Sequence, residues 1–150
     1  MRRGPIVALL LLLLFSATPA PAEWVTAGGS EVPLDGNGQS WLVHATLNGR
    51  LTGVFLLDTG ASYCVLAPTT ARRLGLSSSG EAELRTANGV VRAPLVRLQT
   101  VDVGKNRARD VPAVVHTAVS APLDGVIGLS YLNNFGSYAI DSRRRVLRLR

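Results

Sequence analysis

Few residues of this 150-residue chain are of types that carry out chemistry, and Asp58 stands in an unusual place among them. It follows the apolar run 54–57 and precedes the sequence TGAS, residues 59–62, after which apolar residues resume. Burying a carboxylate between two strand-like segments is costly unless a partner compensates the charge. The simpler alternative is a turn, in which the Asp58 carboxylate accepts hydrogen bonds from nearby backbone N–H groups.

Other reactive residues are sparse and do not form a recognisable site. His44 and His116 each lie singly in a strand-like segment, which is typical of ordinary surface or core positions. Neither metal-ligand spacing, a Gly-x-Ser-x-Gly elbow nor a phosphate loop is present, so we expect neither a metal site nor a cofactor. The single cysteine, Cys64, lies in an apolar run and is predicted to be a small buried residue rather than a nucleophile.

The elements that must position Asp58 are short strands joined by tight turns. Asn48-Gly49, a strong hairpin signal, joins strands over 40–47 and 51–57, and the second of these strands leads into Asp58. Ala67–Leu74 is predicted as a short helix, with Pro68 near its start and Gly75 as its stop. Further strands are predicted over 63–66, 81–85, 90–96, 98–103, 111–115, 138–140 and 146–149, with a short helix after Gly128. This composition indicates an all-β fold, a closed or folded-over β structure with one or two short helices.

The N-terminal segment, residues 1–22, has the features of a secretory signal peptide. Arg2 and Arg3 precede the apolar run 6–15, and Ala20-Pro21-Ala22 provides a small-x-small cleavage pattern. The alternative is an uncleaved anchor, but ten apolar residues are short of the roughly 20 that span a bilayer. Either way, we expect an exported protein, periplasmic or secreted, that could associate with a membrane through this segment. Residues 23–38 are expected to be a leader or linker, and 39–150 the folded domain.

The positive charge is concentrated at the C-terminus. The formal net charge is +6, and five of the last eight residues are arginines. Residues 23–142 are close to neutral, so the sequence does not predict a nucleic-acid-binding face. We interpret 146–149 as a half-buried strand with a solvated basic face. The alternative is attraction to anionic lipid headgroups or acidic partners.

Three segments together resemble the retroviral-type, or retropepsin-like, aspartic proteases, most of all their small bacterial single-domain members. They are LLDTGAS at 56–62, TANGVV at 86–91 and GVIGLSYLNNF at 125–135. The resemblance covers roughly Gln39 to the C-terminus. It implies the folded-over β-barrel of that family and an aspartic endopeptidase acting on a peptide or protein substrate.

The resemblance assigns roles to individual residues. Asp58 would be catalytic, with Thr59, Gly60, Ala61 and Ser62 supporting the active-site loop. In the family, the threonine hydroxyl holds two active loops together, and the glycine leaves room for substrate backbone. Thr86, Ala87, Asn88 and Gly89 would form the flap that closes over substrate and excludes water, with Gly89 giving conformational freedom at its tip.

The chemistry requires two aspartates, but the chain has one Asp-Thr-Gly. Asp124 precedes a glycine without the threonine, and we interpret it as a turn residue. An active enzyme is therefore expected to be a homodimer in which each chain contributes Asp58. Two alternatives remain: a non-catalytic peptide- or protein-binding module with the same fold, and a self-processing or regulated protease that dimerises only at a membrane.

Overall fold

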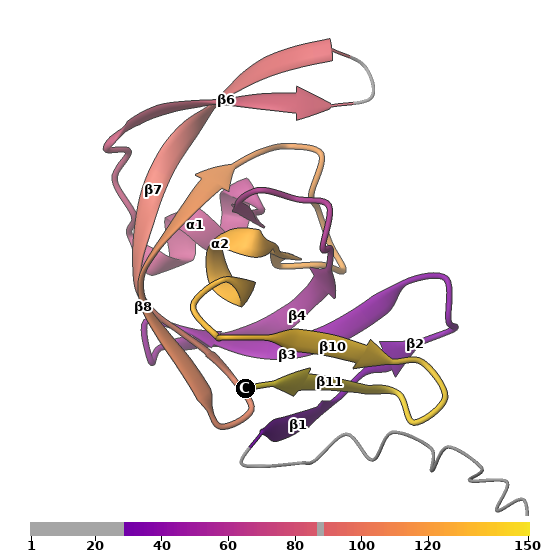
Figure 1. Ribbon diagram of the computed structural model, residues 1–150. Helices are drawn as coiled ribbons and strands as arrows, with labels where there is room; N and C mark the ends of the chain where they lie inside the picture. Colours follow the sequence, from indigo (N-terminus) through magenta and orange to yellow (C-terminus); the bar gives the residue numbers. More distant parts are fainter. Residues whose placement is uncertain (1–28, 87–88) are drawn as a thin grey trace, which may run out of the picture.

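The computed structural model describes residues 29–86 and 89–150, and its main feature is a closed β-barrel (Figure 1). Neighbouring strands run in the order β3, β4, β9, β5, β8 and β7, and pairing between β7 and β3 closes the ring. Their bounds are β3 Trp41–Leu47, β4 Leu51–Leu57, β5 Cys64–Leu66, β7 Gly89–Val103, β8 Asn106–Val115 and β9 Gly125–Ile127. The described residues include two helices, both short, so the predicted all-β barrel is confirmed.

The hairpin that leads to Asp58 forms as the sequence predicts. Asn48 and Gly49 have φ values of 52° and 63°, as the two central residues of a type I′ turn require. Alternate residues of β3 and β4 are buried, among them Leu47 and Phe55 with no exposed surface. This period-2 burial fixes the register of the pair, and so determines where β4 ends and Asp58 begins.

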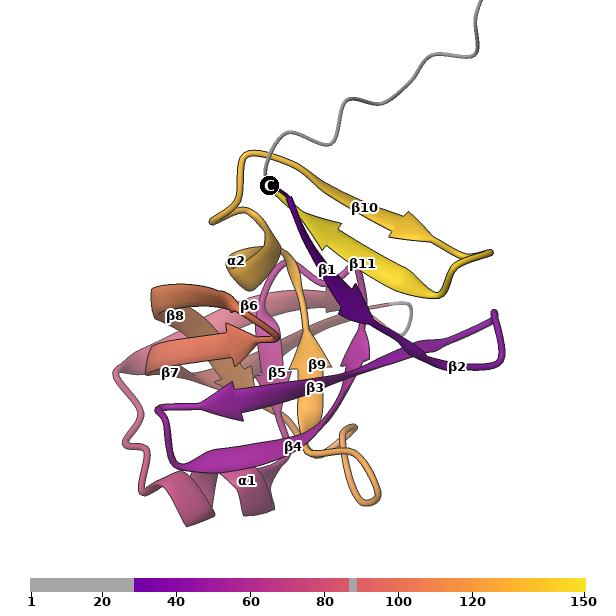
Figure 2. The ribbon, with the colours of Figure 1, turned by 90° about the horizontal axis from the view of Figure 1, so that it is seen from below.

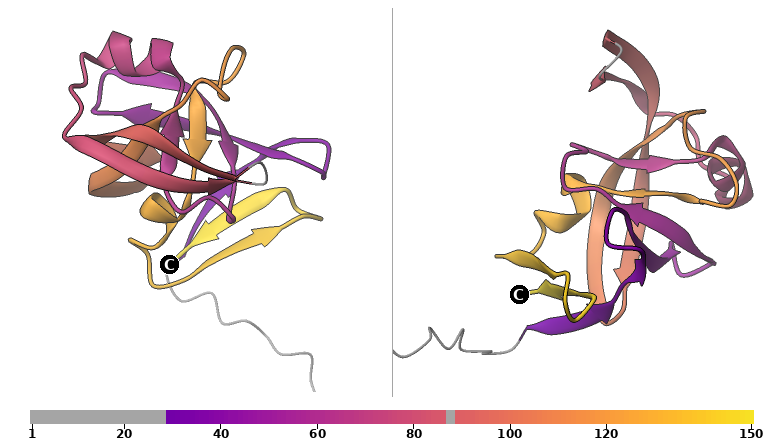
Figure 3. Two further views of the ribbon diagram at one scale, coloured as in Figure 1. Left: turned by 90° about the horizontal axis from the view of Figure 1, so that it is seen from above. Right: turned by 90° about the vertical axis from the view of Figure 1, so that its right-hand side faces the viewer.

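Strand β6, Gly80–Thr86, pairs with the first half of β7 to form a hairpin that projects beyond the barrel (Figures 1 and 3). We expected separate strands over 90–96 and 98–103, whereas β7 is one strand from Gly89 to Val103. Arg97 does not interrupt it, because Val96 and Leu98 on either side are buried while the Arg97 side chain points outward. The second half of this long strand belongs to the barrel, so the hairpin is anchored by the core.

The segment expected as a leader is partly structured, which corrects that prediction. Two strands, β1 (Ser30–Pro33) and β2 (Asp35–Gly36), lie within 23–38. Strand β1 pairs with β11 (Val146–Leu149), and β11 pairs with β10 (Tyr138–Asp141), forming a three-stranded sheet (Figure 2). Val32 and Leu34 are buried against the rest of the fold, but the partner strand lies at the other end of the sequence. Local composition therefore did not reveal it.

The two helices are short and well bounded. Helix α1, Pro68–Leu74, has Pro68 in its first turn and ends at Gly75, which adopts a left-handed conformation, as predicted. Helix α2, Leu129–Leu132, follows Gly128. Views from below and above place α1 and the three-stranded sheet on opposite sides of the molecule (Figures 2 and 3). Neither helix has the length and apolar composition to cross a membrane, a statement limited to the described residues.

Candidate active site

Asp58 lies directly after β4, in a loop anchored to strand β9. Its backbone N–H donates to the carbonyl oxygen of Ile127 at 3.0 Å. Its carboxylate Oδ1 accepts from the Gly60 N–H at 2.8 Å, and its carbonyl accepts from the Ala61 N–H at 3.3 Å. The carboxylate therefore makes a local turn. In the single chain Asp58 is exposed, so the burial suggested by its apolar neighbours is not found.

Helix α2 holds the other end of this loop. The N–H groups of Leu129 and Ser130 donate to the carbonyl oxygens of Ala61 and Ser62, at 2.8 and 3.0 Å. The Ser130 hydroxyl accepts from the Cys64 N–H at 2.8 Å. The loop that carries Asp58 is thus tied to β9 at its start and to α2 at its end, which fixes the direction in which the carboxylate faces.

The close approach of the loop to α2 depends on Gly128. A Cβ atom at this position would lie 2.4 Å from the carbonyl oxygen of Tyr63 and 2.6 Å from that of Ala61. Both contacts are with backbone, which cannot rotate away as a side-chain tip can. The glycine before α2 is therefore a steric requirement of the loop that carries Asp58.

The residues around Asp58 differ in what the structure shows of them. Gly60 is close to the carboxylate, since a Cβ there would lie 3.2 Å from Asp58 Oδ1. Thr59 and Ser62 are exposed, and within residues 29–86 and 89–150 their hydroxyls have no hydrogen bond. Cys64 is buried, as predicted, and burial raises the pKa of its thiol, which disfavours the nucleophilic thiolate.

The hairpin of β6 and β7 contains Thr86 and Gly89, two of the residues expected in the flap, and its strands pair as the sequence predicts. Thr86 pairs with Gly89, and the Thr86 hydroxyl donates to the Gly89 carbonyl oxygen at 2.9 Å. Gly89 has a φ of 118°, so its predicted conformational freedom is used. Ala87 and Asn88, also expected in the flap, lie outside the described residues.

A small apolar cluster links the base of the hairpin to the Asp58 loop. Ala82, Ala93 and Val114 are buried, and four partly buried residues pack against them: Tyr63, Val65, Leu84 and Leu95. Tyr63 comes directly after the TGAS segment, whereas Leu84 belongs to β6. The hairpin and the loop that carries Asp58 therefore share one packed layer.

Asp124 does not complete a catalytic pair with Asp58 in one chain. It precedes β9, which runs parallel to β4, and Gly125 pairs with Phe55. Asp124 therefore lies level with Val54, about 13 Å along the strand from Asp58 at about 3.3 Å per residue. Its carboxylate accepts from the Val54 N–H at 3.0 Å and lies 3.6 Å from the guanidinium of Arg73. It acts as a tie between β4, β9 and α1.

Among the residues that the structure describes, no three His, Cys, Asp or Glu side chains gather where a metal ion could be held. The Asp58 loop offers the chemistry of an exposed carboxylate whose Oδ1 accepts a hydrogen bond from the Gly60 N–H.

Comparisons with known proteins decide the family. A family profile described as aspartyl protease matches residues 43–131, more than half of the chain and including Asp58, the hairpin and Gly128. This chain belongs to the aspartyl protease family. Its fold is similar to that of a retropepsin-like aspartic protease from Rickettsia conorii, with a TM-score of 0.59 and 25% sequence identity. That match covers 81% of this chain and 90% of the other. A search of curated proteins found no match.

Membership of the aspartyl protease family confirms the resemblance and the retropepsin-like fold predicted from the three segments. The sequence did not predict the ties made by Ser130 and Asp124. Serine in GLSYL has no distinctive signal, and the hydrogen bond from Val54 joins residues 70 positions apart. In contrast, the importance of Gly128 could be expected from the sequence, because this glycine follows two hydrophobic residues directly before α2.

Proposed function

We propose that the protein is an exported aspartic endopeptidase whose catalytic pair is formed by Asp58 from two copies of the chain. The observation that carries the proposal is the Asp58 loop: an exposed carboxylate, fixed by β9 and α2, beside a flap-like hairpin in a retropepsin-like fold. One chain provides half of the required dyad, because Asp124 is held level with Val54, just before β9 begins. The exposure of Thr59 next to Asp58 supports a contact between its hydroxyl and the loop of a second copy.

The chemistry follows from placing two carboxyl groups around one water. Like charges about 3 Å apart do not both ionise, so the pair shares one proton and titrates as a unit. The ionised carboxylate takes a proton from water as the water oxygen attacks the peptide carbonyl carbon. The protonated partner donates to the carbonyl oxygen. Collapse of the tetrahedral intermediate breaks the C–N bond, and a proton passes to the leaving amine.

The test compares the wild type with Asp58→Asn on a mixed peptide library over acidic to neutral pH. Asparagine retains an oxygen that can accept from the Gly60 N–H, so the loop is expected to stay folded. Loss of acid–base chemistry should lower the cleavage rate by roughly 10² to 10⁴-fold.

The matched control is Asp110→Asn. Asp110 is exposed, lies in β8, and has a φ of 53°, a conformation that asparagine tolerates well. This variant should cleave as the wild type does. Equal cleavage by the wild type and Asp58→Asn would rule the proposal out.

A second candidate function is a non-catalytic module that has the same fold and binds peptides or proteins. It is favoured by the single Asp-Thr-Gly sequence of the chain, because a permanent monomer would hold half of a site. Sedimentation of the purified chain distinguishes the two. A strict monomer at high concentration, with no cleavage, would support the binding module.

Export is part of the proposal and depends on residues 1–22 alone. The positive start, the apolar run 6–15 and the Ala20-Pro21-Ala22 sequence support secretion to the periplasm or beyond. Mass spectrometry of the N-terminus of the protein recovered from cells separates a cleaved signal peptide from an uncleaved anchor. An uncleaved segment would also favour dimerisation at a membrane.

A further inference from the structure

We propose that one face of the three-stranded sheet is a docking surface for anionic phospholipid headgroups. We define this arginine face by six residues: Glu31, Asp141, Arg143, Arg144, Arg145 and Arg148. They come from β1, from β10 and β11, and from the turn between them. The inference is independent of Asp58 and of catalysis.

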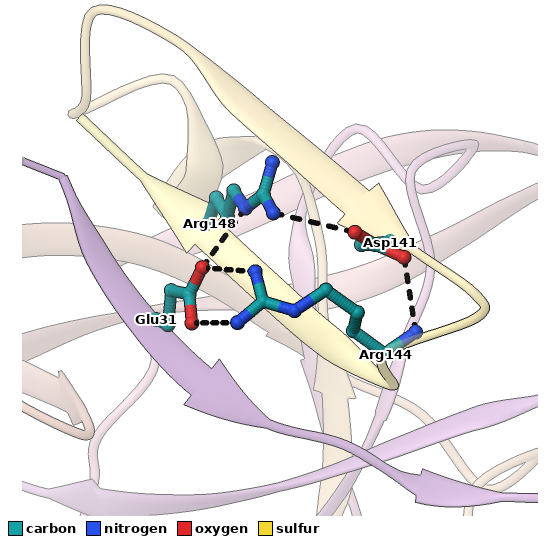
Figure 4. A network of polar contacts seen from close by, with 4 residues as sticks. All are labelled: Glu31, Asp141, Arg144 and Arg148. Atoms are coloured by element: carbon teal, nitrogen blue, oxygen red, sulfur yellow. Dashed lines mark hydrogen bonds and ion pairs between the residues drawn. The ribbon is translucent and has the colours of Figure 1, made fainter. Parts of the chain in front are cut away.

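The centre of the arginine face is a fixed network of charged side chains (Figure 4). Arg144 donates to both carboxylate oxygens of Glu31, at 2.7 and 2.9 Å. Arg148 donates to Glu31 at 3.1 Å and to Asp141 at 3.3 Å. Two arginines are thus paired with the two acidic side chains of this face. Because each guanidinium group donates more than one hydrogen bond, these two arginines also link β1 to β11 and β10.

Positive charge in excess of this network lies at the turn. Residues 29–34 and 137–150 contain five arginines but two acidic side chains. Arg143 and Arg145 are exposed, and no acidic side chain within residues 29–86 and 89–150 forms an ion pair with either. The sheet therefore presents cationic side chains beside a neutralised, ordered centre, which is complementary to a layer of anionic headgroups.

The same face is hollowed. A cavity of about 740 Å³ opens over β10 and β11, and Glu31, Arg143 and Arg148 are among its lining residues. Residues 137–142 also line this cavity. Arginines that line a concave surface can be approached by several headgroups at once. A convex surface would allow fewer headgroups to reach the guanidinium groups together.

The described chain begins beside the strands that carry the arginine face. Strand β1 is antiparallel to β11, with Ser30 paired to Leu149, so the described chain begins beside its own C-terminal strand. The 28 residues before Gly29, including the apolar run 6–15, therefore join the fold at the edge of the arginine face. An apolar segment and a basic patch together provide the two signals that stable membrane attachment needs.

The experiment measures partitioning of the full chain onto vesicles by sedimentation. Vesicles of phosphatidylcholine are compared with vesicles that contain one third phosphatidylglycerol. The readout is the ratio of the two partition coefficients, so that binding by an apolar N-terminal segment cancels. We expect the wild type to favour the anionic vesicles, and added salt to reduce the preference.

The variant R143Q/R145Q should lower this ratio roughly tenfold to thirtyfold, because each arginine near an anionic surface adds its own share to the electrostatic attraction. Arg145 uses its backbone carbonyl to accept from the Leu34 N–H, so the substitution leaves that bond in place. The matched control R50Q/R72Q removes the same charge from exposed positions in the β3–β4 turn and in α1, and should leave the ratio unchanged.

Three results would overturn the proposal. They are equal partitioning onto both kinds of vesicle, an equal loss in R50Q/R72Q, and tighter binding to polyglutamate than to the anionic vesicles. The last result would assign the arginine face to acidic proteins. Both variants must have the same urea midpoint as the wild type, so that a lower partition ratio reflects the loss of charge and not unfolding.

Discussion

At the scale of single residues, the conformation of the Asp58 loop is set by close contacts with backbone groups more than by contacts between side chains. The Asp58 carboxylate is exposed and is positioned by N–H donors and by carbonyl oxygens of its own loop. Gly128 is the residue that allows α2 to come close enough to donate to that loop. Replacing it should therefore affect the loop directly.

We expect Gly128→Ala to lower the free energy of unfolding by about 3 kcal/mol, because the new methyl group overlaps two backbone carbonyls. Urea denaturation measures this change. Gly136→Ala is the matched control, since a Cβ there meets its nearest atom at 3.5 Å, an ordinary contact. An unchanged midpoint for Gly128→Ala would show that the loop and α2 can separate without cost.

At the scale of elements, the three-stranded sheet joins the two ends of the described chain through exposed ion pairs. Hydrogen bonds from Arg144 are the main reason that the pKa of Glu31 lies below its ordinary value of 4.5. The backbone N–H of Arg144 is the main reason that the pKa of Asp141 is also lowered. These contacts favour the charged carboxylates in the folded protein, so they stabilise β1 against the hairpin of β10 and β11.

The sign of the pH dependence follows from that direction. A carboxylate whose pKa is lowered by folding contributes its full stabilisation of the folded protein at neutral pH. For Glu31 this contribution is lost as the pH falls below 4.5, the ordinary pKa, and through the lowered pKa of the folded protein. We expect Glu31→Gln to be less stable than the wild type at pH 7, and the difference to shrink in acid. Urea midpoints at pH 7 and pH 4 provide the measurement.

Glu81→Gln is the control for this prediction. Glu81 is exposed in β6, and among the described residues it forms no ion pair. Its substitution should leave the midpoints unchanged at both pH values. A Glu31→Gln variant that is as stable as the wild type at pH 7 would mean that the ion pairs are too screened by solvent to hold β1.

At the scale of the whole molecule, the proposed activity depends on two chains meeting. The fold holds one Asp58 loop per chain, and Asp124 is fixed at the far end of the parallel pair of β4 and β9. A dimer with a two-fold axis through the Asp58 loops would give each copy the same environment.

Mixing experiments test this arrangement. When Asp58→Asn is added to an equal amount of wild type and the subunits exchange, random pairing should reduce activity to about one half of that of the wild type alone. An active monomer would be unaffected by the added variant. Adding equal Asp110→Asn should instead raise total activity, since that variant keeps Asp58.

The sequence by itself determined the local features. It identified the Asn48-Gly49 turn, helix α1 between Pro68 and Gly75, the buried Cys64, and the segments that carry the aspartyl protease family. These features depend on short-range backbone preferences and on apolar periodicity, and both are determined by a few neighbouring residues. The half-buried strand at the C-terminus was also predicted, and Leu147 and Leu149 are buried there.

Only the tertiary structure decided which distant segments meet. Strand β1 pairs with β11 across almost the whole described chain, and the Asp124 carboxylate accepts from Val54 70 residues away. It also exposed Asp58, which apolar neighbours in sequence had suggested would be buried. Pairing and exposure depend on how the barrel closes, and closure is a property of all six barrel strands together rather than of any one of them.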